Sequence, residues 1–255
     1  VVVASMSVGE ADRTAAECEF TIRFPQVDPA GIVFYPRYFE MVYRSFPKLP
    51  FAAPPLAIRT RFLRPNRLGD HLDLRLEDGD DWTVTGSKDG AEHFSMRALA
   101  LAPPEPRAHD AAVDAFSTLP ASVSDWMADR SGHMSLSRYF ECLNIAIEEW
   151  FESTLGLPFH ALHVGRDIGI PTVQFDTNVR CLPSFGDTFS IRLRPVKLGS
   201  RAMTFRSWLV CGDECHVENE QVVVFVRMLP DGYESITIPD DVSDKFRQQL
   251  QEGKS

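Results

Sequence analysis

A short sequence pattern occurs twice in this chain of 255 residues. The segment 28–40 aligns without gaps with the segment 129–141, and Asp, Gly, Arg, Tyr, Phe and Glu coincide at an offset of 101 residues. A second pair of similar segments, 69–76 and 186–193, is offset by 117 residues, so the second copy has 16 extra residues between the two landmarks. Self-similarity over a unit of this size indicates two fused copies of one small domain.

Each copy predicts a strand, a helix and then four antiparallel strands. Apolar and polar residues alternate over 18–24, as in a half-buried strand, and apolar residues then recur at helical spacing over 39–46. The second copy predicts a longer helix from its apolar stripe over 140–151, and a weaker first strand near 121–127. The remaining strands are expected at 57–63, 70–76, 81–87, 92–101, 172–180, 187–195, 201–211 and 216–228.

A helix followed by an antiparallel sheet, given twice, predicts an α+β fold in which each sheet wraps its helix. Two such copies can pair as the subunits of a homodimer would, with a ligand cleft between them. The 16-residue deficit of the first copy falls between its helix and its next strand, so that helix is expected to be short and to leave room against the sheet.

Composition shifts divide the chain into five parts. A Pro-rich and then Ala- and Asp-rich stretch reads as a linker between the copies, and the charged end of the chain predicts a short surface helix that frays. The predicted parts are an N-terminal extension 1–16, a first domain 17–102, a linker 103–118, a second domain 119–230 and a C-terminal tail 231–255.

The composition excludes several function classes. Apolar residues make up 44% and charged residues 24%, as in soluble globular proteins, and no apolar run is long enough to span a membrane. The N-terminus lacks the basic region of a secretory signal, and the five scattered cysteines do not form a disulfide framework, so a cytoplasmic location is expected. The formal charge of −10 argues against nucleic-acid binding, and no cysteine and histidine spacing matches a metal site.

The turn at Asp28 carries the residues best suited to chemistry. Asp28 and Gly31 lie just before the first predicted helix, whose leading amides have no acceptor inside the helix. A carboxylate beside such donors can attack an acyl carbonyl as a nucleophile, or activate water as a base, while the amides stabilise the oxyanion. Taken alone, however, Asp-Pro-x-Gly is also a common turn before a helix.

The segment 28–38 resembles the signature of the hotdog-fold acyl-CoA thioesterases, specifically the 4-hydroxybenzoyl-CoA thioesterase group. The resemblance implies two tandem hotdog domains that form an intrachain pseudodimer. It also implies that Asp28 is the catalytic carboxylate, that Gly31 shapes the turn, and that the backbone N–H of Tyr35 polarises the thioester carbonyl. One departure is Gln26, which stands where members of the group often have a second Asp.

The second copy resembles a different branch of the same superfamily. The matching positions are Asp129, Gly132, His133 and Tyr139. Ser135 and Leu136 stand where that branch has two Asn residues, so part of the polar equipment is missing. Asp129 is therefore interpreted as a structural relic, with a degenerate second catalytic site as the alternative.

A basic hairpin in the second copy is similar to the segment that binds coenzyme A phosphates in hotdog thioesterases. Its candidate donors are Lys197, Ser200 and Arg201, with the amide of Gly199. The equivalent stretch of the first copy, 77–82, is acidic. This asymmetry predicts one composite site that combines Asp28 with the basic hairpin; the alternative is an ordinary solvated hairpin.

The resemblance as a whole implies hydrolysis of acyl-CoA thioesters to free acid and coenzyme A, without a metal or redox cofactor. The partner is then a small-molecule acyl-CoA, and two chains could assemble as a homodimer of pseudodimers. A non-catalytic acyl-CoA-binding protein and an acyl-carrier-protein thioesterase remain alternatives. A hotdog hydratase is less favoured, because neither Asp28 nor Asp129 has a His five positions on. The acyl group stays open.

Overall fold

The computed structural model describes residues 14–49, 55–79, 81–100, 115–229 and 232–252. The first half contains β1 (Thr14–Thr21), a 3-10 turn (Phe24–Gln26), α1 (Pro36–Ser45), β2 (Leu56–Phe62), β3 (His71–Asp78), β4 (Asp81–Lys88) and β5 (Ala91–Ala100). The second half contains β6 (Phe116–Ser117), β7 (Ala121–Ser122), a 3-10 turn (Asp125–Met127), α2 (Leu136–Leu155), α3 (Phe159–Arg166), β8 (Ile168–Gly169), β9 (Thr172–Val179), β10 (Thr188–Leu198), β11 (Ala202–Cys211) and β12 (Glu214–Val224). A C-terminal segment adds β13 (Val226–Leu229), β14 (Gly232–Ser235) and α4 (Asp240–Glu252).

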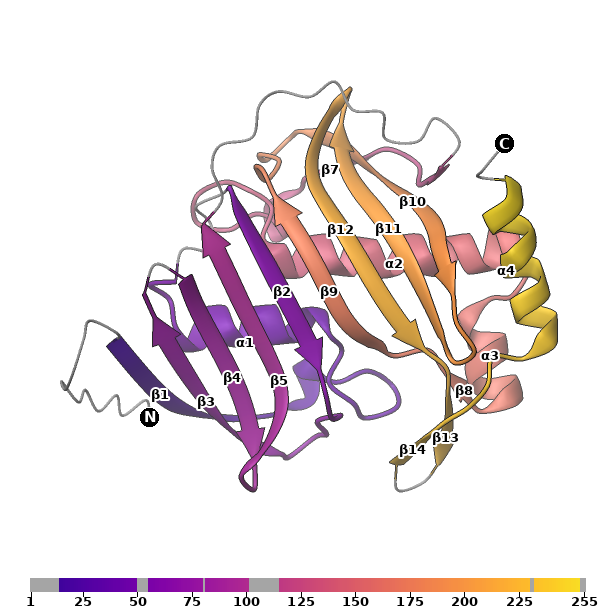
Figure 1. Ribbon diagram of the computed structural model, residues 1–255. Coiled ribbons are helices and arrows are strands. Elements are labelled where there is room, and N and C mark those ends of the chain that lie inside the picture. The colour runs from indigo at the N-terminus through magenta and orange to yellow at the C-terminus, as the bar shows by residue number, and fades with distance from the viewer. Residues whose placement is uncertain (1–13, 50–54, 80, 101–114, 230–231, 253–255) are drawn as a thin grey trace.

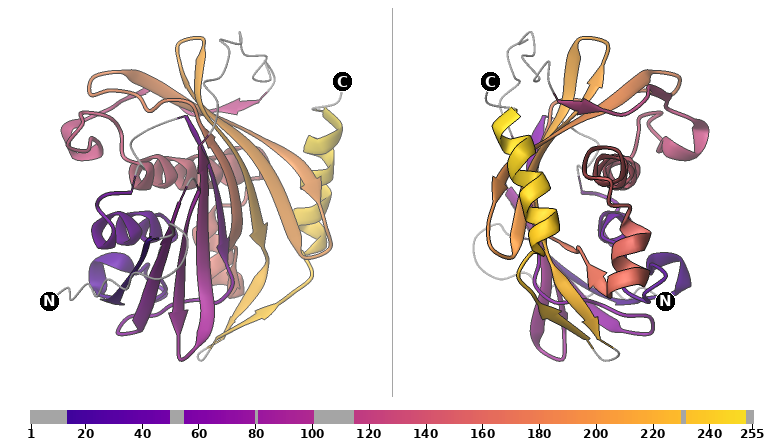
Figure 2. Two further views of the ribbon diagram at one scale, coloured as in Figure 1. Left: turned by 60° about the vertical axis from the view of Figure 1, so that its left-hand side comes forward. Right: turned by 90° about the vertical axis from the view of Figure 1, so that its right-hand side faces the viewer.

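One antiparallel sheet joins the two halves. Among the described residues it has 11 strands, in the order β1-β3-β4-β5-β2-β9-β12-β11-β10-β6, with β7 also paired to β10. The order of the first half returns in reverse in the second, and β2 and β9 pair at the centre, where Ile58 lies opposite Thr177. Both α1 and α2 lie on the same face of this sheet (Figures 1 and 2). The predicted α+β class, with two helix-bearing units side by side, is confirmed.

Side-chain alternation explains which face of the sheet packs on the helices. In β3, Leu72, Leu74 and Leu76 are buried while the residues between them are exposed. At the centre of the molecule the repeat-related rings of Phe39 and Phe140 stack, with centroids 4.1 Å apart and planes 20° apart. Each such buried ring contributes roughly 1.5–3 kcal/mol through burial. The core therefore runs from one half into the other through the two helices.

Most strand predictions hold within a few residues, but the first strand of each copy and the last strand of the second copy need correction. β1 ends at Thr21, before the first 3-10 turn, and the expected strand 121–127 contains only β7 before the second 3-10 turn. The expected strand 216–228 is two strands, because β12 ends at Val224 and β13 begins at Val226 in a different sheet. Buried Phe225 lies at the break, and its amide donates to the carbonyl of Arg201 at 2.9 Å. That bond extends the pairing of β12 with β11 by one residue before the chain enters the second sheet.

A small second sheet has no counterpart in the first half. It consists of β14, β13 and β8, and it projects from the end of the main sheet (Figure 1). Strand β8 and helix α3 lie between α2 and β9, where the second copy has its extra residues. The prediction of a short first helix is confirmed, because α1 has 10 residues and α2 has 20.

The predicted helix near the C-terminus is present, but it is not a frayed surface element. In α4, Val242 and Phe246 are fully buried, and the ring of Phe246 packs against Trp150 at 5.7 Å and Phe205 at 5.5 Å. The helix therefore closes the core beside β10. None of the described helices combines the length and the apolar character that a membrane crossing requires.

The domain boundaries remain predictions. Strand β1 already begins at Thr14, inside the expected extension 1–16. Of the expected linker 103–118, the part up to residue 114 lies outside the described residues, and Phe116–Ser117 form β6.

Candidate active sites in two aspartate loops

The Asp28 loop is a closed turn held by its own backbone. The carboxylate Oδ1 of Asp28 accepts hydrogen bonds from the amides of Ala30 at 2.9 Å and Ile32 at 3.1 Å. The amide of Gly31 donates to the Asp28 carbonyl at 2.9 Å, and Gly31 has φ of +75°, a conformation that costs other residues energy. These bonds fix the Asp28 carboxylate relative to the start of α1.

Tyr35 stands at the start of α1 and reaches into the second half. Its ring packs against Phe175 with centroids 5.1 Å apart, and its hydroxyl donates to the carbonyl of Phe140 at 3.2 Å. Burial, helped by nearby Tyr139 and Glu148, holds the pKa of Tyr35 well above its ordinary value. Among the described residues, none accepts a hydrogen bond from the Tyr35 amide N–H. That amide is thus a donor available to a ligand, on a residue anchored by its ring.

Gln26 has a structural role in this loop. Its side chain is buried, its Oε1 accepts from the amide of Arg23 at 2.8 Å, and its carbonyl accepts from the amide of Phe34 at 3.0 Å. Gln26 thereby braces the 3-10 turn that precedes Asp28. The loop therefore holds its shape with Gln26 at the position where the 4-hydroxybenzoyl-CoA thioesterase group often has a second Asp.

The charge of Asp28 acts on two groups, one from the second half and one from the C-terminal segment. Burial lowers the pKa of His163 in α3, and the carboxylates of Asp28 and Glu148 oppose that shift. Burial raises the pKa of Tyr233 in β14 to about 12, and the charge of Asp28 adds to the rise. Neither residue has a role predicted from the sequence. For His163 the signal in the sequence is the 16-residue surplus of the second copy, which contains α3.

The Asp129 loop repeats the same turn with different side chains. Asp129 Oδ1 accepts from the amide of Ser131 at 2.8 Å and from its hydroxyl at 2.5 Å, and Ser131 Oγ also lies 3.1 Å from His133 Nδ1. Gly132 has φ of +81° and donates its amide to the Asp129 carbonyl at 3.0 Å. Leu136 occupies the position of Tyr35 at the helix start. The loop expected to be a relic therefore keeps the geometry of the Asp28 loop.

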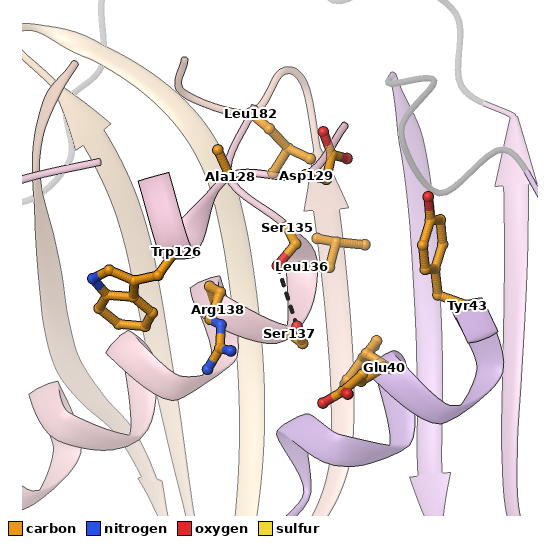
Figure 3. A pocket seen from close by; sticks show the side chains of 11 residues that line it. Glu40, Tyr43, Trp126, Ala128, Asp129, Ser135, Leu136, Ser137, Arg138 and Leu182 are labelled. Atoms are coloured by element: carbon orange, nitrogen blue, oxygen red, sulfur yellow. Dashed lines mark hydrogen bonds between the residues drawn. The ribbon is translucent and has the colours of Figure 1, made fainter. Parts of the chain in front are cut away.

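A pocket of about 250 Å³ opens between the Asp129 loop and α1 (Figure 3). Its lining consists of Phe39, Glu40, Tyr43, Trp126, Ala128, Asp129, Ser135, Leu136, Ser137, Arg138 and Leu182. A second, more open hollow of about 570 Å³ shares Tyr43, Ala128 and Asp129 with it and adds Arg44, Pro47 and Arg130. The sequence predicted a cleft between the two copies and room beside the short first helix, but it did not predict which residues line the groove. Its two walls are about 90 residues apart in the chain, and packing alone brings them together.

The predicted coenzyme A hairpin lies at the same end of the sheet as the Asp28 loop. The segment after β2 holds that loop, since the amide of Val33 donates to the carbonyl of Asn66 at 2.9 Å. From β2 the sheet order passes through β9 and β12 to β11, where the hairpin 199–201 begins. Three strand spacings of about 4.8 Å place β2 and β11 roughly 14 Å apart across the sheet. No hydrogen bond among the described residues joins the hairpin to the Asp28 loop.

Within the hairpin, the Gly199 amide is already engaged. It donates to the carbonyl of Ala202 at 2.8 Å, so it is not a free donor for phosphate, contrary to expectation. The carbonyl of Ser200 accepts from the amide of Ile238 at 2.9 Å, which ties the hairpin to the C-terminal segment. The side chains of Lys197, Ser200 and Arg201 remain the candidate phosphate ligands. Among the described residues, no group of His, Cys, Asp or Glu is arranged to hold a metal ion.

Comparison with known proteins agrees with this architecture. A Lactobacillus plantarum protein described as a candidate oleoyl thioesterase superposes with a TM-score of 0.61 at 12% identity, over 86% of this chain and 98% of its own. The chain has a hotdog-type fold. Residues 123–246 match the family model described as the thioesterase-like superfamily, a match that includes Asp129 but not Asp28.

Two further solved structures each cover about half of this chain. A 1,4-dihydroxy-2-naphthoyl-CoA thioesterase from Synechocystis has a TM-score of 0.46 at 14% identity, over 52% of this chain and 95% of its own. A hypothetical protein from Thermus thermophilus has a TM-score of 0.47 at 24% identity, over 52% of this chain and 98% of its own. Among curated protein sequences, none matches this chain.

Proposed function

We propose that this protein hydrolyses acyl-CoA thioesters to free acid and coenzyme A, with Asp28 as the reacting carboxylate. One observation carries the proposal. A fixed carboxylate and an amide N–H that is free to donate lie on the same short loop, at the start of α1 and against the second half of the molecule. Together they supply the two groups that acyl transfer requires.

In the proposed reaction, the thioester oxygen accepts a hydrogen bond from the Tyr35 amide. The partial positive charge at the start of α1 adds to the stabilisation of the oxyanion. Anchoring of the Tyr35 ring on Phe175 keeps that donor in place as charge develops. Because the donor is preorganised, it needs no rearrangement in the transition state.

Asp28 can complete the reaction by either of two routes. As a nucleophile, its oxygen bonds to the thioester carbon, the carbon–sulfur bond breaks, and the thiolate of coenzyme A leaves; water then hydrolyses the resulting anhydride and regenerates the carboxylate. As a base, it takes a proton from a water molecule that attacks the same carbon, and the thiolate leaves with that proton. Lys197, Ser200 and Arg201 would contact the phosphates in both routes.

Thiol release separates this function from its main alternative, a protein that only binds acyl-CoA. The full chain is mixed with aromatic and aliphatic acyl-CoA esters, and free thiol is measured over time. We expect multiple turnovers with at least one ester. If esters bind in calorimetry but no thiol appears with any of them, the hydrolase proposal is wrong and the binding protein replaces it.

A further inference from the structure

The two hollows beside Asp129 adjoin each other and together form the groove. Tyr43, Ala128 and Asp129 line both of them, so the two hollows meet at the Asp129 loop and the last turn of α1. Figure 3 shows Tyr43 of α1 and Asp129 on opposite sides of the narrower part. The groove therefore has an inner end beside α2 and an outer end beside the last turn of α1.

The outer end of the groove carries two cations that the other half lacks. Arg44 and Arg130 both line it, and both are exposed. The positions related to them by the 101-residue repeat are Ile145 and Pro29. Arg44 has only a loose ion pair, 3.8 Å from Glu40. Asp129 is the acid that lines this outer end, while Glu40 pairs with Arg44 from the inner part of the groove. In a chain with a formal charge of −10, the two guanidinium groups form a local site for an anion.

The inner end of the groove is largely apolar. Phe39, Leu136 and Leu182 contribute aliphatic and aromatic walls. Arg138 lies 5.0 Å from the ring of Trp126, and Glu141 holds it with hydrogen bonds of 2.8 and 2.6 Å. Arg138 is thus a fixed part of the wall rather than a spare cation. A volume of about 250 Å³ is below the roughly 300–1,000 Å³ of pockets for drug-sized ligands, so a short acyl group fits best.

We propose that this groove is a binding site for a short-chain acyl-CoA, separate from the Asp28 site. Arg44 and Arg130 hold the phosphates, the thioester lies beside Asp129 at the start of α2, and the acyl group lies against the inner wall. The ligand class rests on the proposed function, whereas the site rests on the groove itself. The interpretation of the second copy as a relic would then hold for turnover but not for binding.

The experiment is isothermal titration calorimetry of the full chain with coenzyme A and with a hydrolysis-resistant thioether analogue of hexanoyl-CoA. The test variant is Arg44→Gln with Arg130→Gln, and a second variant is Lys197→Gln with Arg201→Gln. A charge-matched control is Arg59→Gln with Arg75→Gln, two exposed arginines on the opposite face of the sheet. Thiol release from hexanoyl-CoA is measured in parallel.

We expect two molecules of analogue per chain. The test variant should lose one of them or bind it about 10- to 100-fold more weakly, as for lost charge-assisted hydrogen bonds, while the control binds as the native chain does. The inference is overturned if the test variant binds no more weakly than the control, or if one molecule binds and only the Lys197 and Arg201 changes remove it. Absence of thiol release with two bound analogues would refute the hydrolase and leave this site standing.

Discussion

The Asp28 and Asp129 loops have the same backbone and different surroundings. In both, a carboxylate accepts from the second residue after it, and a glycine with positive φ closes the turn. Around Asp28, however, the chain adds α3 and β14, whereas around Asp129 the short α1 leaves a groove. Local hydrogen bonds therefore preserve the turn in both copies, while differences in the length of the surrounding segments decide which elements lie next to each aspartate.

The largest expected effect on stability distinguishes Phe140 from Phe39, the two stacked rings at the centre of the molecule. Phe140 is fully buried against Tyr35, Phe39 and Phe175, so Phe140→Ala should lower the free energy of unfolding by about 3–5 kcal/mol. Phe39 lines the groove on one side, so the void left by Phe39→Ala is open to water and the loss should be smaller. Urea denaturation measures both variants. Equal losses would mean that the two halves pack alike and that the groove is not open.

A smaller effect tests whether both loops need their glycines. Gly31→Ala and Gly132→Ala force a side chain into the left-handed region, which should cost each variant about 1–2 kcal/mol. Gly165 in α3 has open space around it and helical geometry, so Gly165→Ala is the matched control and should be neutral or stabilising by up to ~1 kcal/mol. Thermal unfolding compares the three. A neutral Gly31→Ala would show that the turn at Asp28 is not fixed as described.

The smallest expected effect is a pH dependence of stability that arises from His163 in α3. Burial depresses the pKa of His163 below its ordinary value of 6.5, so the unfolded chain binds that proton more readily than the folded chain. The folded state should therefore lose stability as the pH falls below about 6.5. His163→Gln should reduce this loss, and His160→Gln, an exposed neighbour on the same helix, should not.

Denaturation midpoints between pH 7.5 and 5 provide the test for these two histidine variants. Buried His93 and half-buried His216 also have a lowered pKa, so the His163 variant should flatten the profile only in part. If His160→Gln flattens it as much as His163→Gln does, partial burial of the His163 imidazole is not the cause of the pH dependence.

Much of the fold could be predicted from the sequence because its signals are local. The repeat defined two copies, and alternation located strands such as β3 and β4 within a few residues. The small sheet escaped prediction because β8 has two residues and pairs with β13, far along the chain. A strand of two residues carries no periodicity.

The candidate site was predicted only where it lies within one segment. Asp28, Gly31 and Tyr35 follow one another closely, so their turn chemistry is readable in the sequence. The groove at Asp129 depends on Tyr43 and Arg44 from the other copy, and the contribution of His163 depends on how α3 folds back. Such pairings are set by packing between distant segments, which one sequence read in order does not reveal.

The central claim is that two loops of equal geometry have unequal roles, and one measurement tests it most directly. Asp28→Asn and Asp129→Asn each keep a side-chain oxygen that can accept the loop hydrogen bonds, so both variants should fold. Thiol release from an acyl-CoA ester that the native chain hydrolyses is then compared. We predict that kcat falls by about 10²–10⁴-fold for Asp28→Asn and stays within about twofold for Asp129→Asn. Loss of turnover only with Asp129→Asn would contradict the account and move catalysis to the open groove.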